Sequence, residues 1–189
     1  MTDLTAGPDG LLRCSWVTGA PEYLGYHDDE WGRAVTGDDA LFERLSLEGF
    51  QSGLSWITVL RKRDAFRAAF DGFALEKVAS YDESDVERLM VDAGIVRNRA
   101  KIQTTIRNAQ LSLEISGGLS DHLWSFAPEP VVPPVQRATA PESEALAADL
   151  RRRGFRFVGP TTAYALMQAT GMVNDHAVGC VAREAVRVP

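Results

Sequence analysis

Several features that mark common protein classes are scarce or missing in this 189-residue sequence. It has no run of eighteen apolar residues, which argues against a membrane-spanning helix. Its first ten residues, MTDLTAGPDG, lack the basic start and the apolar stretch of a signal peptide. Its two cysteines are too few for a disulfide framework. With 20 Lys and Arg against 26 Asp and Glu, its net charge of −6 excludes a uniformly basic protein that coats nucleic acid. We therefore expect a soluble, cytoplasmic protein that does not bind membranes.

Long alternating strand patterns are also missing, and the best candidate for a strand is the short segment FRFV at residues 155–158. Apolar residues instead recur three and four positions apart, which is typical of helices. A capping box of Thr139 and Glu142 is expected to begin one helix, and Gly154 to end it. We predict an all-α fold. The expected helices cover residues 21–31, 38–47, 55–62, 64–70, 85–92, 98–113, 139–153 and 160–170.

Proline is concentrated in one place, because five of the nine prolines lie between residues 126 and 141. This composition predicts an extended connector. The segment that follows it, of about fifty residues, is too short to hold a large core alone. We therefore expect residues 1–189 to form one unit in which that segment packs back onto the first part, with residues 1–12 as an N-terminal extension.

Charge is unevenly distributed along the chain. Residues 1–30 and 108–150 each carry a net charge of −5 and residues 31–60 carry −2, whereas residues 61–107 carry +2 and residues 151–189 carry +4. The basic residues cluster at 61–67, 97–107 and 151–156. Each cluster alone is typical of a solvated helix face, but together they are compatible with one basic face on an acidic body.

The few cysteines and histidines fall into two pairs near the two ends of the chain. Cys14 precedes His27 as C-x12-H, and His176 precedes Cys180 as H-x3-C. If the segment that carries the second pair is helical, both side chains share one face. Two thiolates and two imidazoles form the ligand set of a closed structural zinc site, which would join the chain ends. The alternative is that the cysteines are small buried hydrophobes and the histidines only form hydrogen bonds.

One carboxylate lies among many aromatic residues. Glu48 belongs to the segment LEGFQSGLSW at residues 47–56. The aromatic residues near it in the sequence are Trp16, Tyr23, Tyr26, Trp31 and Trp56. Such a set predicts a pocket that stacks a flat, electron-poor ligand, for example a cationic purine base, and accepts hydrogen bonds from it. The alternative is that the aromatic residues belong to the core and that Glu48 caps a surface loop.

Residues 86–108 are expected to form a helix, a tight turn at Gly94 and a second helix. Arg97, Arg99 and Lys101 follow the turn. Backbone N–H groups at the turn and at the start of the second helix can bind a phosphate, and the basic side chains would add attraction. A helical hairpin without any role in nucleic-acid binding is the alternative.

Six segments match one known family in the same order along the chain. They are RCSW at 13–16, YHDDEWG at 26–32, LEGFQSGLSWITVLRKR at 47–63, DAGIVRNRAKI at 92–102, GFRFVGPTTAYALMQATG at 154–171 and VNDHAVGC at 173–180. These segments, which extend from about residue 12 to residue 180, resemble the DNA-3-methyladenine glycosylase I family.

The resemblance implies an all-α helix-hairpin-helix glycosylase fold that acts on alkylated double-stranded DNA and releases free 3-methyladenine. It also implies one structural zinc ion per chain. The implied metal ligands are Cys14, His27, His176 and Cys180, and the implied base pocket consists of Glu48, Trp16, Tyr23, Tyr26 and Trp56. DNA contacts are expected at Gly94, Arg97, Arg99 and Lys101. We expect a monomer.

Methylation at N3 gives adenine a positive charge, so the base leaves the sugar as a neutral group and needs little acid catalysis. This chemistry suits a site with one carboxylate, Glu48. The nucleotide would be flipped out of the duplex, with its base stacked on Tyr26 and Trp56, and hydrolysis would leave an abasic site. No lysine stands out as a Schiff-base nucleophile, so we expect no strand cleavage. The alternatives are a zinc-stabilised DNA-binding module that releases no base, and a glycosylase for another lesion.

Overall fold

The computed structural model of the chain describes residues 4–129 and 137–186 and is mostly helical. None of the helices in these ranges is long and apolar enough to cross a membrane. The α-helices are α1 (Glu22–Asp29), α2 (Asp38–Gln51), α3 (Trp56–Leu60), α4 (Arg63–Ala69), α5 (Leu75–Ala79), α6 (Glu83–Val91), α7 (Arg99–Leu113), α8 (Leu119–Trp124), α9 (Pro141–Arg152) and α10 (Pro160–Ala169). Single 3-10 turns occur at Ser15–Gly19 (η1) and Asp71–Phe73 (η2).

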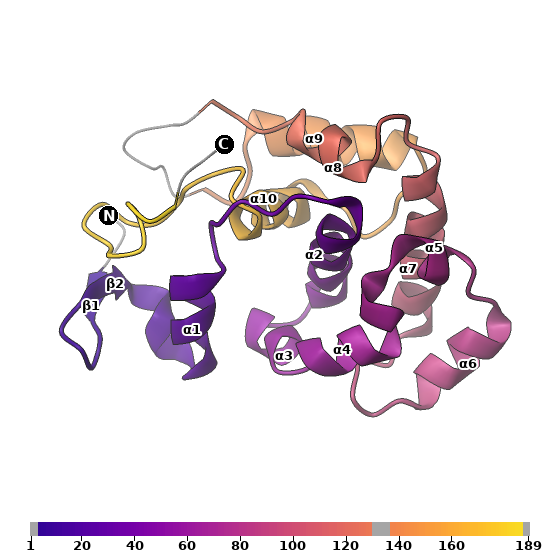
Figure 1. Cartoon of the computed structure of the whole chain (residues 1–189), viewed down its shortest axis with the longest axis horizontal. Helices are drawn as coiled ribbons and strands as arrows, with labels where there is room; N and C mark the ends of the chain where they lie inside the picture. The colour runs from indigo at the N-terminus through magenta and orange to yellow at the C-terminus, as the bar shows by residue number, and fades with distance from the viewer. Residues whose placement is uncertain (1–3, 130–136, 187–189) are drawn as a thin grey trace.

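Helix α2 runs through the middle of the molecule (Figure 1), with α4 to α7 on one side and α8 to α10 above. Its apolar face, which includes Phe42 and Phe50, is fully buried. The Phe50 ring lies 4.6 Å from that of Phe66, and Phe70 stacks on Phe73 at 5.3 Å. Each buried phenylalanine stabilises the fold by about 2–3 kcal/mol. Glu48 therefore projects from a helix whose apolar face is held in the core.

The all-α prediction is wrong at the N-terminus, where β1 (Leu4–Ala6) pairs antiparallel with β2 (Leu12–Cys14). Residues 155–158, the best candidate for a strand, do not form one. Phe157 has a φ of +56°, which interrupts an extended backbone. The amide of Asn108 bonds both the N–H and the carbonyl oxygen of Arg156, so a side chain replaces a strand partner there.

The predicted hairpin is present, because α6 and α7 are joined by a tight turn over residues 92–98. Asp82 accepts a hydrogen bond from the Ser84 N–H at the start of α6, and Asn98 accepts one from the Lys101 N–H at the start of α7. The capping box expected at Thr139 is one residue out of register: Ser143 accepts from the N–H of Ala140, the residue before α9.

Residues after α9 return to the first part of the chain. Gly154, with a φ of +102°, ends α9 as predicted, and α10 then packs against both α9 and α2. At the C-terminal end of α10, Gly171 has a φ of +75° and lies so close to residues 32–34 that a Cβ atom would come within 2.6 Å of their backbone. Of the proline-rich connector at 126–141, residues 130–136 lie outside the described part of the chain.

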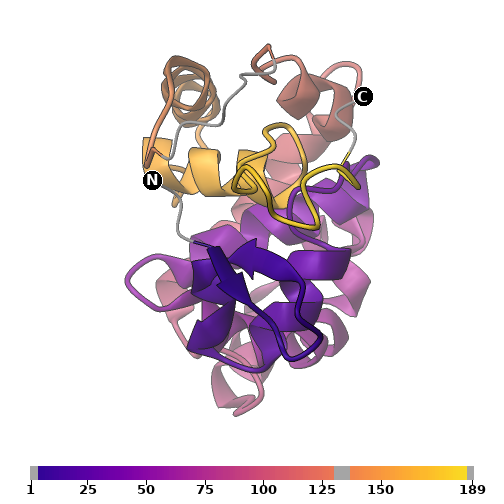
Figure 2. The ribbon, with the colours of Figure 1, turned by 90° about the vertical axis from the view of Figure 1, so that its left-hand side faces the viewer.

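The segment beyond α10 is not helical, which contradicts the helix considered for the second Cys/His pair. Its backbone groups are bound by side chains: Asn174 accepts from the His176 N–H, and Arg183 donates to the carbonyls of Asn174 and His176. The segment runs back to the N-terminal ribbon, where the Val181 N–H donates to the Leu12 carbonyl at 2.9 Å. Figure 2 shows it lying beside β1, β2 and α1, so residues far apart in sequence become neighbours.

Candidate functional site

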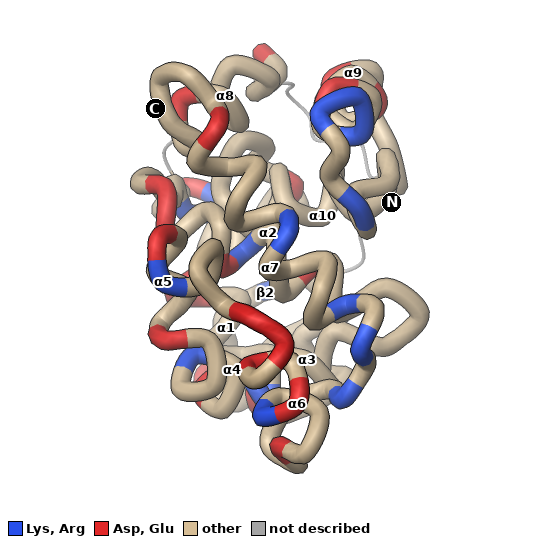
Figure 3. The backbone as a smooth tube through the Cα atoms, turned by 90° about the vertical axis from the view of Figure 1, so that its right-hand side faces the viewer, with Lys and Arg blue, Asp and Glu red and all other residues tan. Residues whose placement is uncertain are grey.

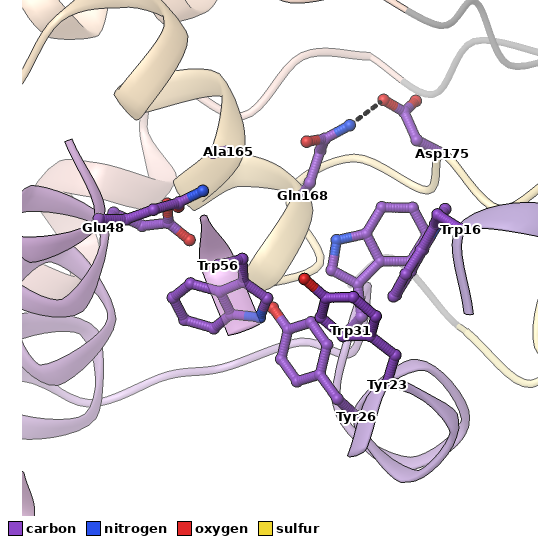
Figure 4. A pocket seen from close by; sticks show the side chains of 10 residues that line it. Trp16, Tyr23, Tyr26, Trp31, Glu48, Trp56, Ala165, Gln168 and Asp175 are labelled. Carbon is purple, nitrogen blue, oxygen red and sulfur yellow. Dashed lines mark hydrogen bonds between the residues drawn. The ribbon is translucent and has the colours of Figure 1, made fainter. Parts of the chain in front are cut away.

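A cavity of about 310 Å³ opens between α1, α2 and α10. The structure places all five predicted pocket residues around it (Figure 4), although they come from four separate elements. Its lining consists of Trp16, Tyr23, Tyr26, Trp31, Glu48, Gln51, Trp56, Ala165, Gln168 and Asp175. The core-and-loop alternative for Glu48 is wrong, because Glu48 is 5% exposed and faces the cavity.

Glu48 carries the only acidic group on the α2 side of this cavity, and no described residue forms a hydrogen bond with its carboxyl group. Burial raises the pKa of Glu48 to about 8, and the more distant Arg44 opposes this only in part. Glu48 is therefore largely protonated at neutral pH while the cavity is empty. A cation placed beside it would favour the ionised form.

Aromatic rings form the walls of the cavity. The rings of Tyr26 and Trp56 lie 5.4 Å apart at a tilt of 47°, and Trp16 contacts Tyr23 edge-on at 5.5 Å. The Tyr23 hydroxyl accepts a hydrogen bond from the Ile57 N–H, which ties α1 to the start of α3. This contact places Trp56, the first residue of α3, against the cavity.

Two of these rings carry hydrogen-bond donors without partners in the described part of the chain. The indole N–H of Trp56 is buried and unpaired. Burial raises the pKa of the Tyr26 hydroxyl well above its usual value, so this group keeps its proton. Buried polar groups in native structures usually have partners. These donors therefore indicate a ligand that offers lone pairs.

Behind the aromatic wall, the two predicted Cys/His pairs meet in one buried group that could hold a metal ion. The ligand atoms of Cys14, His27, His176 and Cys180 all lie within 4.8 Å of one another. His27 Nε2 is 3.2 Å from His176 Nδ1 and 3.4 Å from the Cys180 sulfur. The Cys180 and Cys14 sulfurs lie 3.6 Å and 3.9 Å from His176 Nδ1.

Hydrogen bonds on the far side of each imidazole orient it toward this group. His27 Nδ1 donates to Asp28 at 2.7 Å, and Asp28 is in turn held by Arg13 at 2.8 Å. His176 Nε2 donates to the Trp31 carbonyl at 3.0 Å. The other nitrogen of each ring therefore presents a lone pair to the cysteines. A histidine that binds a metal typically has such a partner.

Burial favours neutral donors in this group. It raises the pKa of the Cys14 thiol to about 12 and lowers the pKa of His176 to about 4. Neutral imidazoles are ready to bind a metal, and a divalent cation would displace the thiol protons. The donor set of this group is therefore chemically suited to a divalent metal ion.

The buried group also supports the cavity wall directly. The Trp31 ring lies 4.6 Å from the His176 ring, and the Trp16 ring lies 5.2 Å from the His27 ring. Both tryptophans line the cavity on their other side. Any distortion of the Cys/His group would therefore move two walls of the cavity.

The residues predicted to contact DNA differ in how free they are. Arg97 is exposed and forms no ion pair among the described residues. The Arg99 guanidinium is paired with Glu83 at 2.7 Å and Glu87 at 2.6 Å. The Gly94 N–H already donates to the Asp92 carboxylate at 2.7 Å.

Lys101 requires a correction, since it is buried rather than available to DNA. Its ammonium donates to the carbonyl oxygens of Phe50 at 2.7 Å and Ser52 at 2.6 Å, at the C-terminal end of α2. Cations are favourable at such a helix end. A sequence signal for this role exists: Lys101 is spaced four residues before Thr105, on the buried face of α7.

Sequence reasoning did not assign Gln168 or Asp175 to the pocket. Gln168 is the polar residue in the apolar last part of α10, residues 165–169, and Asp175 lies in the irregular segment after the helix. A polar residue within this apolar stretch was the available signal for Gln168. The position of Asp175 depends on a loop path that no local pattern describes.

Comparisons with known proteins agree with this site. The family model for methyladenine glycosylase matches residues 16–184. DNA-3-methyladenine glycosylase 1 of Escherichia coli (strain K12) is 50% identical over 181 residues, which cover 90% of this chain and 96% of that protein. DNA-3-methyladenine glycosylase of Haemophilus influenzae is 42% identical over 177 residues, which cover 89% and 96%. A crystal structure of a 3-methyladenine DNA glycosylase I variant in complex with 3-methyladenine matches with a TM-score of 0.84 at 34% identity, covering 90% of this chain and 96% of that one.

The buried carboxyl of Glu48 predicts how stability changes with pH. Its pKa of about 8 in the folded chain exceeds the ordinary value of 4.5, so its contribution to stability is complete below about pH 4.5 and is lost as the pH rises through 8. The Glu48→Gln variant has no carboxyl group here to ionise, so it does not lose this stability as the pH rises. At about 1.4 kcal/mol per pKa unit, the free energy of unfolding of the variant relative to wild type should rise by about 4 kcal/mol between pH 5 and pH 9.

Denaturant unfolding at both pH values measures this difference. Glu76→Gln is the control, because Glu76 is exposed and should leave the pH dependence of wild type unchanged. Identical pH dependence in Glu48→Gln and wild type would contradict the burial of an isolated carboxyl group.

Proposed function

The chain belongs to the methyladenine glycosylase family, and on that premise we propose that it is a DNA repair enzyme that hydrolyses the N-glycosidic bond of 3-methyladenine in alkylated DNA. The observation that carries the proposal is the buried, unpartnered carboxyl group of Glu48 in a cavity walled by Tyr26 and Trp56. The volume of about 310 Å³ is at the lower end of the range for ligand pockets, about 300–1,000 Å³. It suits one planar base.

Charge would distinguish the damaged base from normal adenine. The empty cavity keeps Glu48 largely neutral, and a base that carries a positive charge in DNA would ionise it and gain an ion pair in a water-poor site. Neutral adenine offers no such gain. Discrimination would thus come from the charge that methylation itself creates.

The same charge makes the base a good leaving group. When the bond between N9 and the sugar breaks, its electron pair stays with the base, which leaves neutral. Water then adds to the sugar cation and loses a proton, which yields an abasic site. No lysine lines the cavity within the described residues, which supports hydrolysis without a Schiff base and without strand cleavage.

Double-stranded DNA would have to lie across the cavity so that a flipped nucleotide can enter. Basic positions follow one side of the face drawn in Figure 3, from α9 down to the region beside α3, and acidic positions gather on the other side near α5. Arg97, Arg151 and Arg156 are exposed and form no ion pair among the described residues. We assign the phosphate contacts to these three, and the turn between α6 and α7 to a helix-hairpin-helix grip on the backbone.

Zinc is the metal that best suits the Cys/His group. With zinc about 2.3 Å from sulfur and about 2.0 Å from nitrogen, a tetrahedral site has neighbouring nitrogens about 3.3 Å apart and sulfur–nitrogen pairs about 3.5 Å apart. The nitrogens here are 3.2 Å apart, and the sulfur–nitrogen distances are 3.4 Å and 3.6 Å for Cys180 and 3.9 Å from Cys14 to His176. One ion held by Cys14, His27, His176 and Cys180 would have a structural role, because no ligand position is left open.

Methylated duplex DNA tests the function. The wild-type protein should release 3-methyladenine as the main free base and leave unbroken strands with abasic sites. Glu48→Ala should lower the release rate by about 10²-fold or more, because it removes the group that meets the charge of the base. Free bases are identified by chromatography. DNA binding without base release would favour a DNA-binding module instead, and a fully active Glu48→Ala protein would remove Glu48 from the mechanism.

Salt dependence of binding tests the DNA contacts. Arg97→Ala and Arg156→Ala should each reduce the slope of log affinity against log salt concentration by about one, because each removes one phosphate contact. Arg152→Ala is the matched control, since Arg152 is an equally exposed arginine already paired with Asp149 at 2.9 Å. An effect of Arg152→Ala as large as that of Arg156→Ala would refute this assignment.

Elemental analysis of the purified protein should find about one zinc per chain. Cys180→Ser should lower that content and the thermal midpoint, because metal affinity contributes to folding. His122→Gln should retain the zinc, since His122 bonds Asp149 instead and lies outside the group. Active, folded protein that contains no metal would exclude the structural zinc site.

A further inference from the structure

Two polar side chains on the cavity wall have no part in the mechanism above. Gln168 projects from α10 and Asp175 from the segment that follows, and both line the cavity. The Gln168 Nε2 donates to Asp175 Oδ2 at 2.9 Å, as the dashed line in Figure 4 shows. The Tyr164 hydroxyl donates to the same oxygen at 2.7 Å. Asp175 is 8% exposed, so this small network is shielded from water.

This network fixes which end of the Gln168 amide faces the cavity. A carboxylate only accepts hydrogen bonds, so it selects the NH₂ end of the amide. Rotating the amide would bring two oxygens to within about 2.9 Å of each other, which is repulsive. The carbonyl oxygen Oε1 therefore points away from Asp175, and Figure 4 shows it on the side of the cavity that also holds Glu48.

The groups that bind Asp175 exclude an alternative arrangement of these hydrogen bonds. Burial and the bond to Asp175 raise the pKa of Tyr164 to about 12, so its hydroxyl keeps the proton that it donates. The Arg137 Nε donates to the Tyr164 oxygen at 3.3 Å, which leaves Asp175 as the acceptor for the tyrosine proton. The main chain of Gln168 is also held, because its carbonyl accepts from the Gly32 N–H at 3.0 Å.

We propose that Asp175 is a positioning residue that holds the Gln168 carbonyl oxygen toward the cavity, and that Gln168 is a specificity-determining acceptor for N–H donors on the edge of the bound base. The inference rests on the proposed function, because it takes a purine base as the ligand. The site would therefore prefer a base that carries an exocyclic amino group at the edge facing Gln168. A base that carries a carbonyl oxygen at the same edge would bind less well.

Glu48 alone cannot supply that preference. Glu48 responds to the positive charge of the base, and adenine and guanine methylated at N3 carry the same charge in DNA. Charge therefore does not separate the two bases. The Gln168 amide cannot adapt, since Asp175 holds its donor end. An acceptor that meets a carbonyl oxygen leaves both groups unpaired, which typically costs about 1–3 kcal/mol.

The experiment uses the full chain and DNA treated with a methylating agent, which forms both 3-methyladenine and 3-methylguanine. These bases differ in whether the edge carries an amino group or a carbonyl oxygen. The kcat/KM for release of each base gives a selectivity ratio. Gln168→Met keeps the length of the side chain and removes the acceptor, and Asp175→Asn lets the amide rotate. Each should lower the ratio by about tenfold.

Tyr164→Phe is the matched control. It removes one donor to Asp175 and leaves the bond from Gln168 in place, so its selectivity ratio should stay close to that of wild type. Zinc content and thermal unfolding are measured for every variant, because Asp175 precedes His176. If Asp175→Asn does not fold, the pair of Gln168→Met and Tyr164→Phe decides alone.

An unchanged ratio in Gln168→Met would overturn the proposal, as would a loss of selectivity in Tyr164→Phe equal to that in Asp175→Asn, which would indicate general damage to the wall. Failure of the proposed function looks different. In that case the wild-type protein releases neither base from DNA, and the inference falls with it.

Discussion

The joining of residues 14 and 27 to residues 176 and 180 is the constraint on which the rest of the structure depends. Three of the four residues of this buried group lie within two positions of a residue of the cavity. Tyr26 precedes His27, and Asp175 precedes His176. Cys14 is followed two residues later by Trp16. A metal ion bound by these four donors would therefore also stabilise the positions of the cavity walls.

Burial holds Glu48 largely neutral, and a cationic base beside it would favour the ionised form. Burial alone raises the pKa of Glu48, and no arginine or lysine lines the cavity to compensate an ionised carboxylate. Positively charged side chains lie outside the cavity. Many belong to exposed arginines, and Lys101 is buried at the C-terminal end of α2. This separation would let a chain with a net charge of −6 present a basic surface to DNA. The acidic excess would limit how strongly DNA is held without preventing its binding.

How much the sequence could predict depended on whether a feature is local. The aromatic pocket, the Cys/His set and the hairpin were predictable, because short motifs carry them and the helical pattern places them. The burial of Lys101 was not, since its acceptors at Phe50 and Ser52 lie 51 and 49 residues away. The segment that carries His176 also escaped prediction, because Asn174 and Arg183 side chains, rather than a periodic pattern, bind its backbone. Local sequence patterns indicated which residues form the site. Tertiary contacts determine the protonation states and the orientations of their side chains.

The sequence separation within the Cys/His group has a consequence for the synthesis of the protein. His27 and Cys180 are 153 residues apart. At about 5–20 residues per second, a ribosome needs on the order of ten seconds to pass from one to the other. During that interval α1 and its aromatic residues emerge without the partners that bury them. A chain that stops before Cys180 lacks one of the four donors of the Cys/His group, so the group that packs behind Trp16 and Trp31 is complete only when synthesis is nearly finished.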